Sequence, residues 1–460
     1  MYYWIADHLS VIMFGVLAMM MFCGYPVAFV LGGVGLGFGA LGILFDVFNP
    51  LQFFNIMPRI FGSTVQNQVL VAVPMFIFMG TMLEKSRVAD DLLYCLQVLL
   101  RRVPGGLALS VTMMGTIMAA TTGIVGASVV MLTLIALPAM LTRGYSKELS
   151  VGTIASAGTL GILIPPSIML VIMGDLLGIS VGTLFTAAIV PGLLLSALYT
   201  VYIVGISWVN PKAAPALAAD LGPQSGAELL RLVFKSFVPP AFLIFLVLGS
   251  IFLGWATPTE ASGVGALGAI LLALANGRLN MKVLREVMES AALTNAMVFF
   301  IFFGATLFAY VFRALGGDDV VVELLRALGI DTGWKILIFM MILVFILGFF
   351  FDWIEICLVV LPVFAPLLRK LDFTPHLAGN NEFLPWFAIL IAVNLQASFL
   401  TPPFGFALFY MKGTVPPTVT MLHIYRGIIP FVVLQLTAVA LIMTWPEIAM
   451  WMPKATGFLD

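Results

Sequence analysis

Two carboxylates within an apolar stretch are the residues of this sequence with the clearest capacity for chemistry. Asp352 and Glu355 belong to the run FFFDWIEI, residues 349–356. An ionisable side chain at membrane depth is energetically costly and usually functional. We interpret Asp352 as a cation ligand, and a proton-carrying or packing carboxylate is the alternative. Glu355 lies three residues further on, where one helical face would present it as a second ligand or as a structural hydrogen-bond acceptor.

Uncharged polar residues gather in three other apolar segments. TTGIVGAS (121–128) and SAGTLGILIPPS (156–167) combine hydroxyls with glycines, and NLQASFLTPP (394–403) carries a second Pro-Pro. Small residues permit close backbone approach, and Thr and Ser supply oxygens that can bind a cation. The same composition is typical of packing contacts between membrane helices. For the first two segments, the residues alone do not decide between cation binding and helix packing. We expect the third to face the carboxylate run.

The composition indicates that these groups lie in a membrane. Of 460 residues, 62% are hydrophobic and 9% are charged, whereas a soluble domain averages about 25% charged residues. The net charge of −1 offers no electrostatic footprint for nucleic acid. Three scattered cysteines exclude a disulfide framework, and no Gly-Lys-Ser/Thr loop for ATP is present. We predict an all-α polytopic membrane protein that moves a solute.

Twelve apolar segments are candidates for crossing or entering the bilayer. About 20 apolar residues span its hydrocarbon core as a helix. Uninterrupted stretches occupy residues 9–23, 26–48, 69–83, 181–206, 237–254, 257–276, 293–312 and 427–445. Two long interrupted runs predict re-entrant hairpins, and two segments with Pro-Pro predict broken helices; these are 105–141 and 337–368, and 150–174 and 386–411. Residues 84–104 are amphipathic and predict an interfacial helix, and 207–236 reads as an extramembrane loop. Thr257 and Glu260 fit a capping box.

The chain repeats itself. VPMFIFMGTML (73–83) resembles MVFFIFFGATL (297–307) at a shift of 224 positions. The same shift aligns Leu137-Pro138 with Leu361-Pro362 and Ser128 with Asp352. With each hairpin entering and leaving on one side, an odd number of crossings separates the two similar helices. The repeats are therefore inverted.

The inverted topology assigns each basic residue to one side of the membrane. Fourteen of the 21 Lys and Arg residues fall on one side and seven on the other, and the richer side is cytoplasmic by the positive-inside rule. Both termini then lie outside the cytoplasm. We predict N-terminal scaffold helices (1–70), a first repeat with a cytoplasm-facing hairpin (71–180), further scaffold helices (181–292), a second repeat with a periplasm-facing hairpin (293–415) and a C-terminal helix and tail (416–460).

Inverted repeats with interrupted helices are typical of secondary transporters. A broken helix leaves carbonyl and amide groups that lipid cannot satisfy, so they persist where they are buried in protein or bind a solute. A channel would need a continuous polar pore, and only two polar clusters are evident. A membrane-embedded enzyme would need a nucleophile and a base, and neither HExxH nor Gly-x-Ser-x-Gly occurs. A proton-coupled transporter or an ion antiporter remains an alternative.

The sequence resembles the large membrane subunit of the tripartite ATP-independent periplasmic (TRAP) transporters over nearly its whole length. The resemblance rests on these runs: YPVAFVLGGVG (25–35), VPMFIFMGTML (73–83), Gly-Ala-Ser (126–128), LPAMLTRGYS (137–146), ASAGTLGILIPPSIMLVIMG (155–174), WATPTEASGVGALGA (255–269) and LTPPFGFALF (400–409). It implies a sodium-driven importer of organic acids in a bacterial inner membrane, working as an elevator. It also implies two partners, a periplasmic substrate-binding protein and a separate small membrane subunit.

The resemblance further implies where ligands bind. Sodium would lie where each hairpin tip meets its broken helix, and it would be the coupling ion with no other cofactor. One sodium site would use Ser128 with Gly158, Gly161 and nearby carbonyls. The other would use Asp352 with Gln396, Ser398 and Thr401. Substrate would lie between the tips, near Thr121, Thr122 and Asn394.

Overall fold

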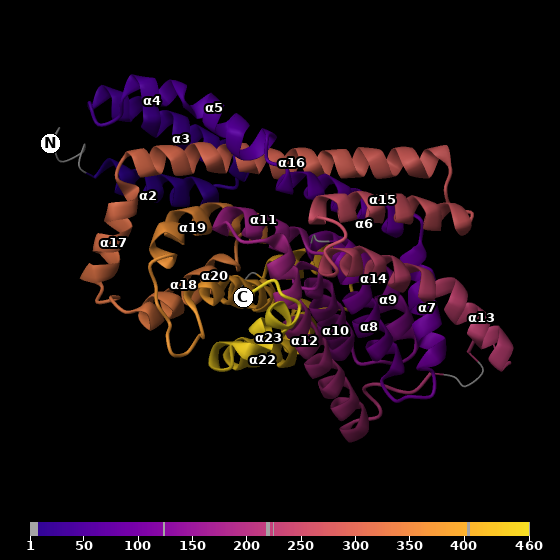
Figure 1. The fold of residues 1–460 in the computed structure, drawn as a ribbon. Helices are drawn as coiled ribbons and strands as arrows, with labels where there is room; N and C mark the ends of the chain where they lie inside the picture. The colour runs from indigo at the N-terminus through magenta and orange to yellow at the C-terminus, as the bar shows by residue number, and fades with distance from the viewer. Residues whose placement is uncertain (1–7, 123–124, 218–220, 224, 403–404, 460) are drawn as a thin grey trace.

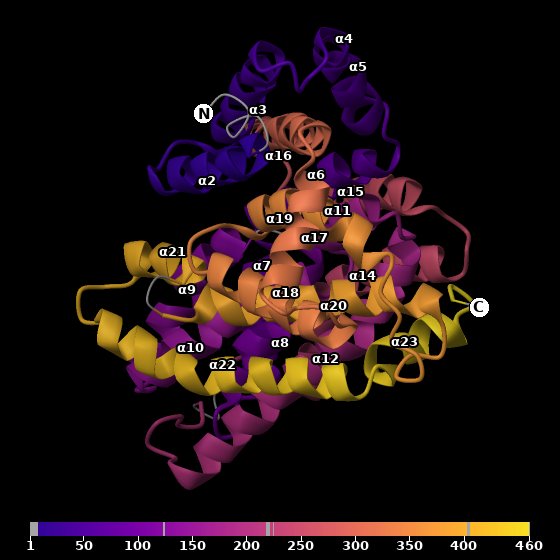
Figure 2. The same cartoon turned by 90° about the vertical axis from the view of Figure 1, so that its left-hand side faces the viewer.

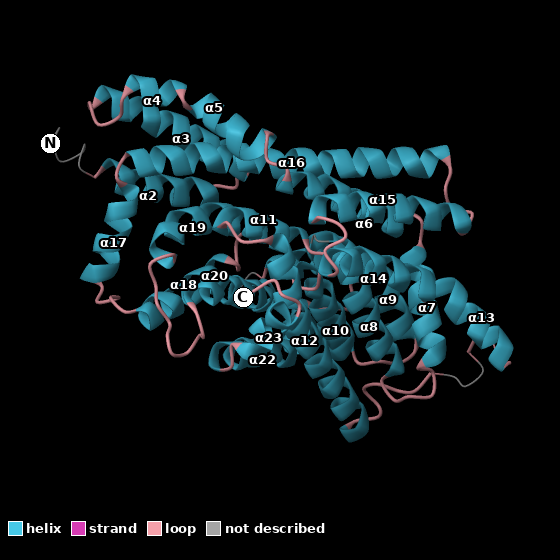
Figure 3. Cartoon of the chain, in the orientation of Figure 1, coloured by secondary structure: helices cyan, strands magenta, loops and turns pink. Residues whose placement is uncertain are grey.

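The protein is built from helices joined by short connections. A computed structural model describes residues 8–122, 125–217, 221–223, 225–402 and 405–459. No strand occurs among these residues, and helices account for the regular structure (Figure 3). Seven described helices are long and apolar enough to cross a membrane, or up to nine if each of two bent pairs counts as one span. The predicted all-α polytopic fold is confirmed.

The seven long apolar helices are α3 (Val27–Leu44), α9 (Val125–Thr142), α12 (Val181–Val209), α15 (Pro258–Ala275), α16 (Met281–Ala314), α20 (Asn380–Leu400) and α22 (Met421–Thr444). Shorter elements connect them or complete the predicted hairpins and broken helices. They are α2 (Leu9–Phe22), α4 (Pro50–Phe54), α5 (Ile56–Ile60), η1 (Phe61–Val65), η2 (Val69–Val71), α6 (Ala72–Lys85), α7 (Val88–Leu99), α8 (Gly106–Thr122), α10 (Lys147–Thr159), η3 (Leu160–Ile162), α11 (Ile168–Leu177), α13 (Gly226–Ser236), α14 (Val238–Phe252), α17 (Gly317–Ala327), α18 (Gly333–Leu347), α19 (Trp353–Leu368), α21 (Phe406–Thr414) and α23 (Glu447–Ala455).

The order of elements repeats. A leading helix, a short amphipathic helix, a hairpin and a broken helix follow one another as α6, α7, α8–α9 and α10–α11, and again as α16, α17, α18–α19 and α20–α21. Each leading helix, α6 and α16, ends two residues before a residue in the left-handed region, with φ of 55° at Arg87 and 77° at Gly316. The predicted hairpins and broken helices are present at the predicted positions.

The two repeats are inverted. Glu84 and Lys85, at the end of α6, line the same cavity as Glu286, near the start of α16. Arg59 precedes α6 in the chain, and its guanidinium lies 5.8 Å from the ring centroid of Tyr310, near the other end of α16. Equivalent helices of the two repeats therefore run antiparallel.

Both views place α3, α4, α5 and α16 together along one edge of the molecule (Figures 1 and 2). The hairpins and broken helices lie in the body of the molecule below this edge, with α19 next to α16. Small residues let α3 approach α16 closely: a Cβ added at Gly304 would lie 2.7 Å from the Ala28 carbonyl oxygen. We call α3–α5 and α16 the arm layer.

Two expected boundaries change in the structure. Residues 226–236, expected as loop, form helix α13, because Arg231 and Lys235 alternate with apolar residues at helical spacing. The helix expected over 293–312 begins at Met281, where an Arg285–Glu289 ion pair of 2.7 Å supports an additional polar segment. The capping box at Thr257 is confirmed, with its N–H donating to Glu260 Oε2 at 2.8 Å.

Candidate functional site

The first hairpin packs closely against its broken helix at a glycine. Gly158, on α10, lies against Val129, on α9: an added Cβ would be 2.6 Å from Val129 Cγ2 and 3.1 Å from its Cα. Ser128, the chain neighbour of Val129, is 4% exposed. The structure therefore places Gly158 against the residue that follows Ser128 in the chain, and a shared sodium site stays a prediction.

The first broken helix is interrupted directly after this contact. Helix α10 ends at Thr159, the 3-10 turn η3 contains the buried Gly161, and α11 begins only at Ile168. The last carbonyls of a helix have no intrahelical partner. Ser167 Oγ donates to the Ile162 carbonyl at 2.6 Å, which satisfies one oxygen of the intervening segment. The other carbonyls at the end of α10 suit a cation, as in the broken helices of transporters.

The second hairpin meets its broken helix through side chains. Asn394 Nδ2, on α20, donates to the Met341 carbonyl of α18 at 2.8 Å. One turn further along, a Cβ added at Gly348 would overlap Ser398 Oγ. Both Asn394 and Ser398 are buried. This face of α20 therefore packs along α18, with Asn394 bonded to a carbonyl in the middle of that helix and Ser398 beside Gly348 at its end.

Asp352 and Glu355 form a capping box at the start of α19. The Asp352 carboxylate accepts from the Trp353 N–H at 2.8 Å, and the Asp352 N–H donates to Glu355 Oε2 at 3.3 Å. The structural hydrogen bond considered for Glu355 is therefore present. A carboxylate has about four acceptor positions, so Asp352 keeps the capacity to bind a cation while it caps the helix.

Gln396 lies apart from the other residues grouped with Asp352. Residues two apart on an α-helix differ by about 200° in direction, so Gln396 lies opposite the face on which Asn394 and Ser398 contact the second hairpin. It is 0% exposed, and among the described residues neither its amide nitrogen nor its amide oxygen has a hydrogen-bond partner. Thr401 ends α20, and its hydroxyl donates to the Ala397 carbonyl at 2.7 Å.

The first hairpin also contacts the broken helix of the other repeat, which the sequence analysis missed. A Cβ added at Gly126, on α9, would lie 2.9 Å from the ring of Tyr410, on α21 of the other repeat. Beside this contact is a cavity of about 770 Å³, with charged groups at Glu84, Lys85, Arg87, Asp90 and Glu286. No feature of the sequence around Tyr410 indicated the contact. The side chains of the predicted substrate residues Thr121 and Thr122 lie outside the described residues.

Comparisons with known proteins agree on one family. The family model described as "Tripartite ATP-independent periplasmic transporter, DctM component" matches residues 14–448. The C4-dicarboxylate TRAP transporter large permease protein DctM of Pseudomonas aeruginosa is 30% identical, with 91% of this chain and 93% of that protein covered. The isethionate TRAP transporter permease protein DctMQ of Oleidesulfovibrio alaskensis is 30% identical over 97% of this chain and 67% of that protein. The ectoine TRAP transporter large permease protein TeaC of Halomonas elongata is 29% identical, over 83% and 86%.

Among solved structures, the YdaH transporter of Alcanivorax borkumensis superimposes with a TM-score of 0.58. The match covers 97% of this chain and 99% of that chain at 15% sequence identity. At this level of identity the similarity concerns the fold.

Proposed function

This chain belongs to the DctM component family of tripartite ATP-independent periplasmic transporters, and on that premise we propose that it imports an organic acid by coupling to sodium. It is a multi-pass protein of the bacterial inner membrane and a transporter permease, not an enzyme. Large permeases of this family work with a small membrane subunit and a periplasmic binding protein. We expect both partners here as separate chains.

The relatives support an organic acid as the substrate. Their names specify C4-dicarboxylate, isethionate and ectoine, which are small polar solutes that carry an acidic group. Such a solute would be delivered by the binding protein, so the acid transported depends on that partner. Thr121, Thr122 and Asn394 remain our proposal for residues near the substrate.

The observation that carries the sodium proposal is the packing of each hairpin tip against a helix break. At the first break, Ser128 and the carbonyls near Gly158 and Gly161 offer oxygen ligands. At the second, Asp352 offers a carboxylate, and Ser398 and Thr401 offer hydroxyls. Oxygen ligands of this kind, including the carbonyls of unwound helices, coordinate sodium in other secondary transporters. The face that Gln396 occupies favours a role elsewhere.

Movement of the body against the arm layer is our proposal for alternating access. Arg313, near the end of α16, donates to the Pro362 carbonyl of α19 at 2.6 Å. The cavity of about 770 Å³ beside Gly126 lies near the opposite end of α16. By the charge assignment above, that cavity faces the cytoplasm. These features are consistent with an inward-open conformation, and an elevator motion would break the Arg313 contact in each cycle.

The test is uptake by proteoliposomes. The chain is reconstituted with its small membrane partner, given its binding protein and labelled succinate, isethionate or ectoine, and supplied with an inward sodium gradient without ATP. We expect uptake that needs both sodium and the binding protein. Uptake that persists when choline replaces sodium would overturn sodium coupling and keep the transporter assignment.

A proton-coupled transporter is the second candidate, favoured by one observation. Asp352 and Glu355 share a capping box, and a pair of neighbouring carboxylates can hold a proton between them. In this case an inward proton gradient alone would drive uptake in the same proteoliposomes, and sodium would have no effect.

A further inference from the structure

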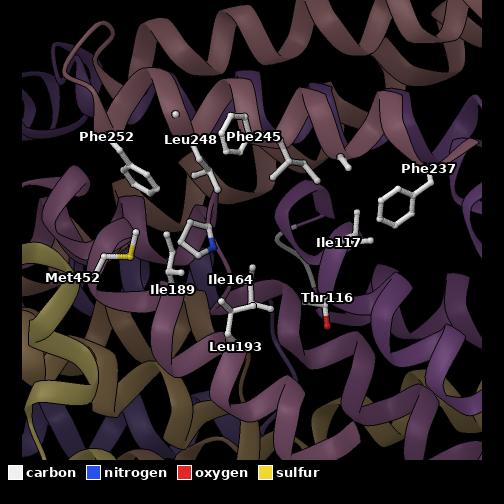
Figure 4. A pocket seen from close by; sticks show the side chains of 14 residues that line it. Thr116, Ile117, Ile164, Ile189, Leu193, Phe237, Phe245, Leu248, Phe252 and Met452 are labelled. Atoms are coloured by element: carbon white, nitrogen blue, oxygen red, sulfur yellow. The ribbon is translucent and has the colours of Figure 1, made fainter. Parts of the chain in front are cut away.

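An apolar cavity of about 440 Å³ lies between α14 and the body of the protein (Figure 4). One wall is α14 with the residue that precedes it, and its lining residues run from Phe237 to Phe252. The opposite wall includes Ile117 of α8 and Ile189 and Leu193 of α12. The cavity therefore separates a peripheral helix from α8 of the first repeat and from α12.

The lining offers no free hydrogen-bonding side chain. Thr116 carries the one polar side chain among the lining residues. Its hydroxyl is engaged by Ser196 Oγ at 2.7 Å and by the Thr112 carbonyl at 2.8 Å. A cavity with this lining excludes water and favours an apolar occupant. The occupant must therefore be a hydrocarbon group.

The cavity is continuous with the surface that faces lipid. Leu193 is 55% exposed and Phe245 is 74% exposed, and both also line the cavity. In a multi-pass membrane protein, exposed apolar side chains on spanning helices contact acyl chains. We propose that the cavity is a binding site for an acyl chain of a membrane phospholipid, inserted between α14 and α12.

The length and charge of this region fit a phospholipid. The wall from Phe237 to Phe252 spans about 22 Å at 1.5 Å per residue, and one leaflet of the hydrocarbon core is about 15 Å thick. Beyond Phe237, the amphipathic helix α13 carries the exposed Arg231 and Lys235. Basic residues on an interfacial helix attract phosphate headgroups. The headgroup would lie by α13 and the chain along α14.

The lipid would also contact the break in the first broken helix. Ile164 and Pro165, between η3 and α11, line the cavity. The same interruption contains Gly161, three residues before Ile164. An acyl chain here would support the interruption from its lipid side. This inference does not depend on which ion or acid is transported.

The first test measures lipid retention by native mass spectrometry of the full chain. The protein is extracted from palmitoyl-oleoyl phosphatidylethanolamine and phosphatidylglycerol vesicles and washed with detergent. Gly249 lines the cavity, and a Cβ added there meets nothing within 4 Å, so Gly249→Phe fills the cavity without a clash at Cβ. Gly205, on α12 outside the cavity, is equally unobstructed, and Gly205→Phe is the matched control.

We expect the wild type and Gly205→Phe to retain one phospholipid per chain, and Gly249→Phe to bind it at least about fivefold more weakly. Equal retention by the two variants, or no retained lipid on the wild type, would overturn the proposal. A second measurement avoids variants: a phosphatidylcholine with a diazirine on its acyl chain is photolysed with the wild type. Labelling should concentrate on residues 244–252 of α14. Equal labelling of Leu267 and Leu271, exposed on α15, would show ordinary annular lipid and overturn it.

Discussion

The two hairpins occupy equivalent places in the fold but contact their broken helices by different means. In the first repeat the contact is steric, because Gly158 leaves room for the backbone of Val129. In the second repeat the contact is polar, because Asn394 bonds to a carbonyl of α18 and Ser398 lies against Gly348. The first unit, which is the first hairpin with its broken helix, packs closely because Gly158 has no side chain. The second unit, the second hairpin with its broken helix, is held by the side chains of Asn394 and Ser398.

The two hairpins also differ in charge at an equivalent position. A shift of 224 positions relates Ser128, near the start of α9, to Asp352, which caps α19. Helix α19 begins later in this alignment, at Trp353, whereas α9 begins at Val125. Inverted repeats can thus keep one architecture while the polar side chain at an equivalent position differs. We expect the first unit to be sensitive to added volume and the second to lost charge.

The largest effect should come from Gly158→Val. Any Cβ at this position would press on Val129, including its backbone at 3.1 Å, and overpacking of this kind costs about 1–3 kcal/mol. We expect sodium-driven uptake to fall to background and the melting temperature in detergent to fall. Gly205→Val, at a glycine with no neighbour within 4 Å, should change neither. Normal uptake by Gly158→Val would show that the first contact is not close in the working protein.

Asp352→Asn should have the next largest effect. Asn caps a helix about as well as Asp, so this variant removes the charge and keeps the cap. We expect the sodium concentration for half-maximal uptake to rise at least about tenfold, equivalent to about 1.4 kcal/mol, with an unchanged melting temperature. Asp352→Ala should abolish sodium dependence and also lose about 1 kcal/mol of stability with the cap. Wild-type sodium affinity in Asp352→Asn would exclude the carboxylate as a ligand.

Ser128→Ala should have a smaller effect, because backbone carbonyls remain at the first site. Loss of one neutral ligand costs about 1 kcal/mol of binding free energy. We therefore expect a sodium affinity about fivefold weaker, measured by the same uptake titration. Unfolding of this variant would instead favour a packing role for the hydroxyl. Comparison with Asp352→Asn then ranks the two sites within one assay.

The sequence predicted the fold better than the contacts within it. Hairpins and broken helices follow from glycines, prolines and apolar length, which act locally, so 105–141 and 386–411 could be located without coordinates. Contacts such as Gly126 with Tyr410 depend on how the two repeats cross, which no local pattern encodes. The family resemblance implied the grouping of Gln396 with Ser398, but two residues along a helix is about half a turn, so the two side chains lie on opposite faces of α20.

Gln396→Met should have the smallest effect. It tests whether Gln396, on the face of α20 opposite Ser398, takes part in the second site. Met has a similar shape without the amide, and the amide has no partner among the described residues. Replacing an unsatisfied buried polar group by an apolar one of similar shape is nearly neutral or stabilising. We therefore expect sodium affinity within about twofold of wild type and a melting temperature that is equal or higher. A tenfold loss of sodium affinity with intact folding would show that Gln396 turns toward the second site during transport. In that case the second site would include a ligand from the face of α20 that points away from α18.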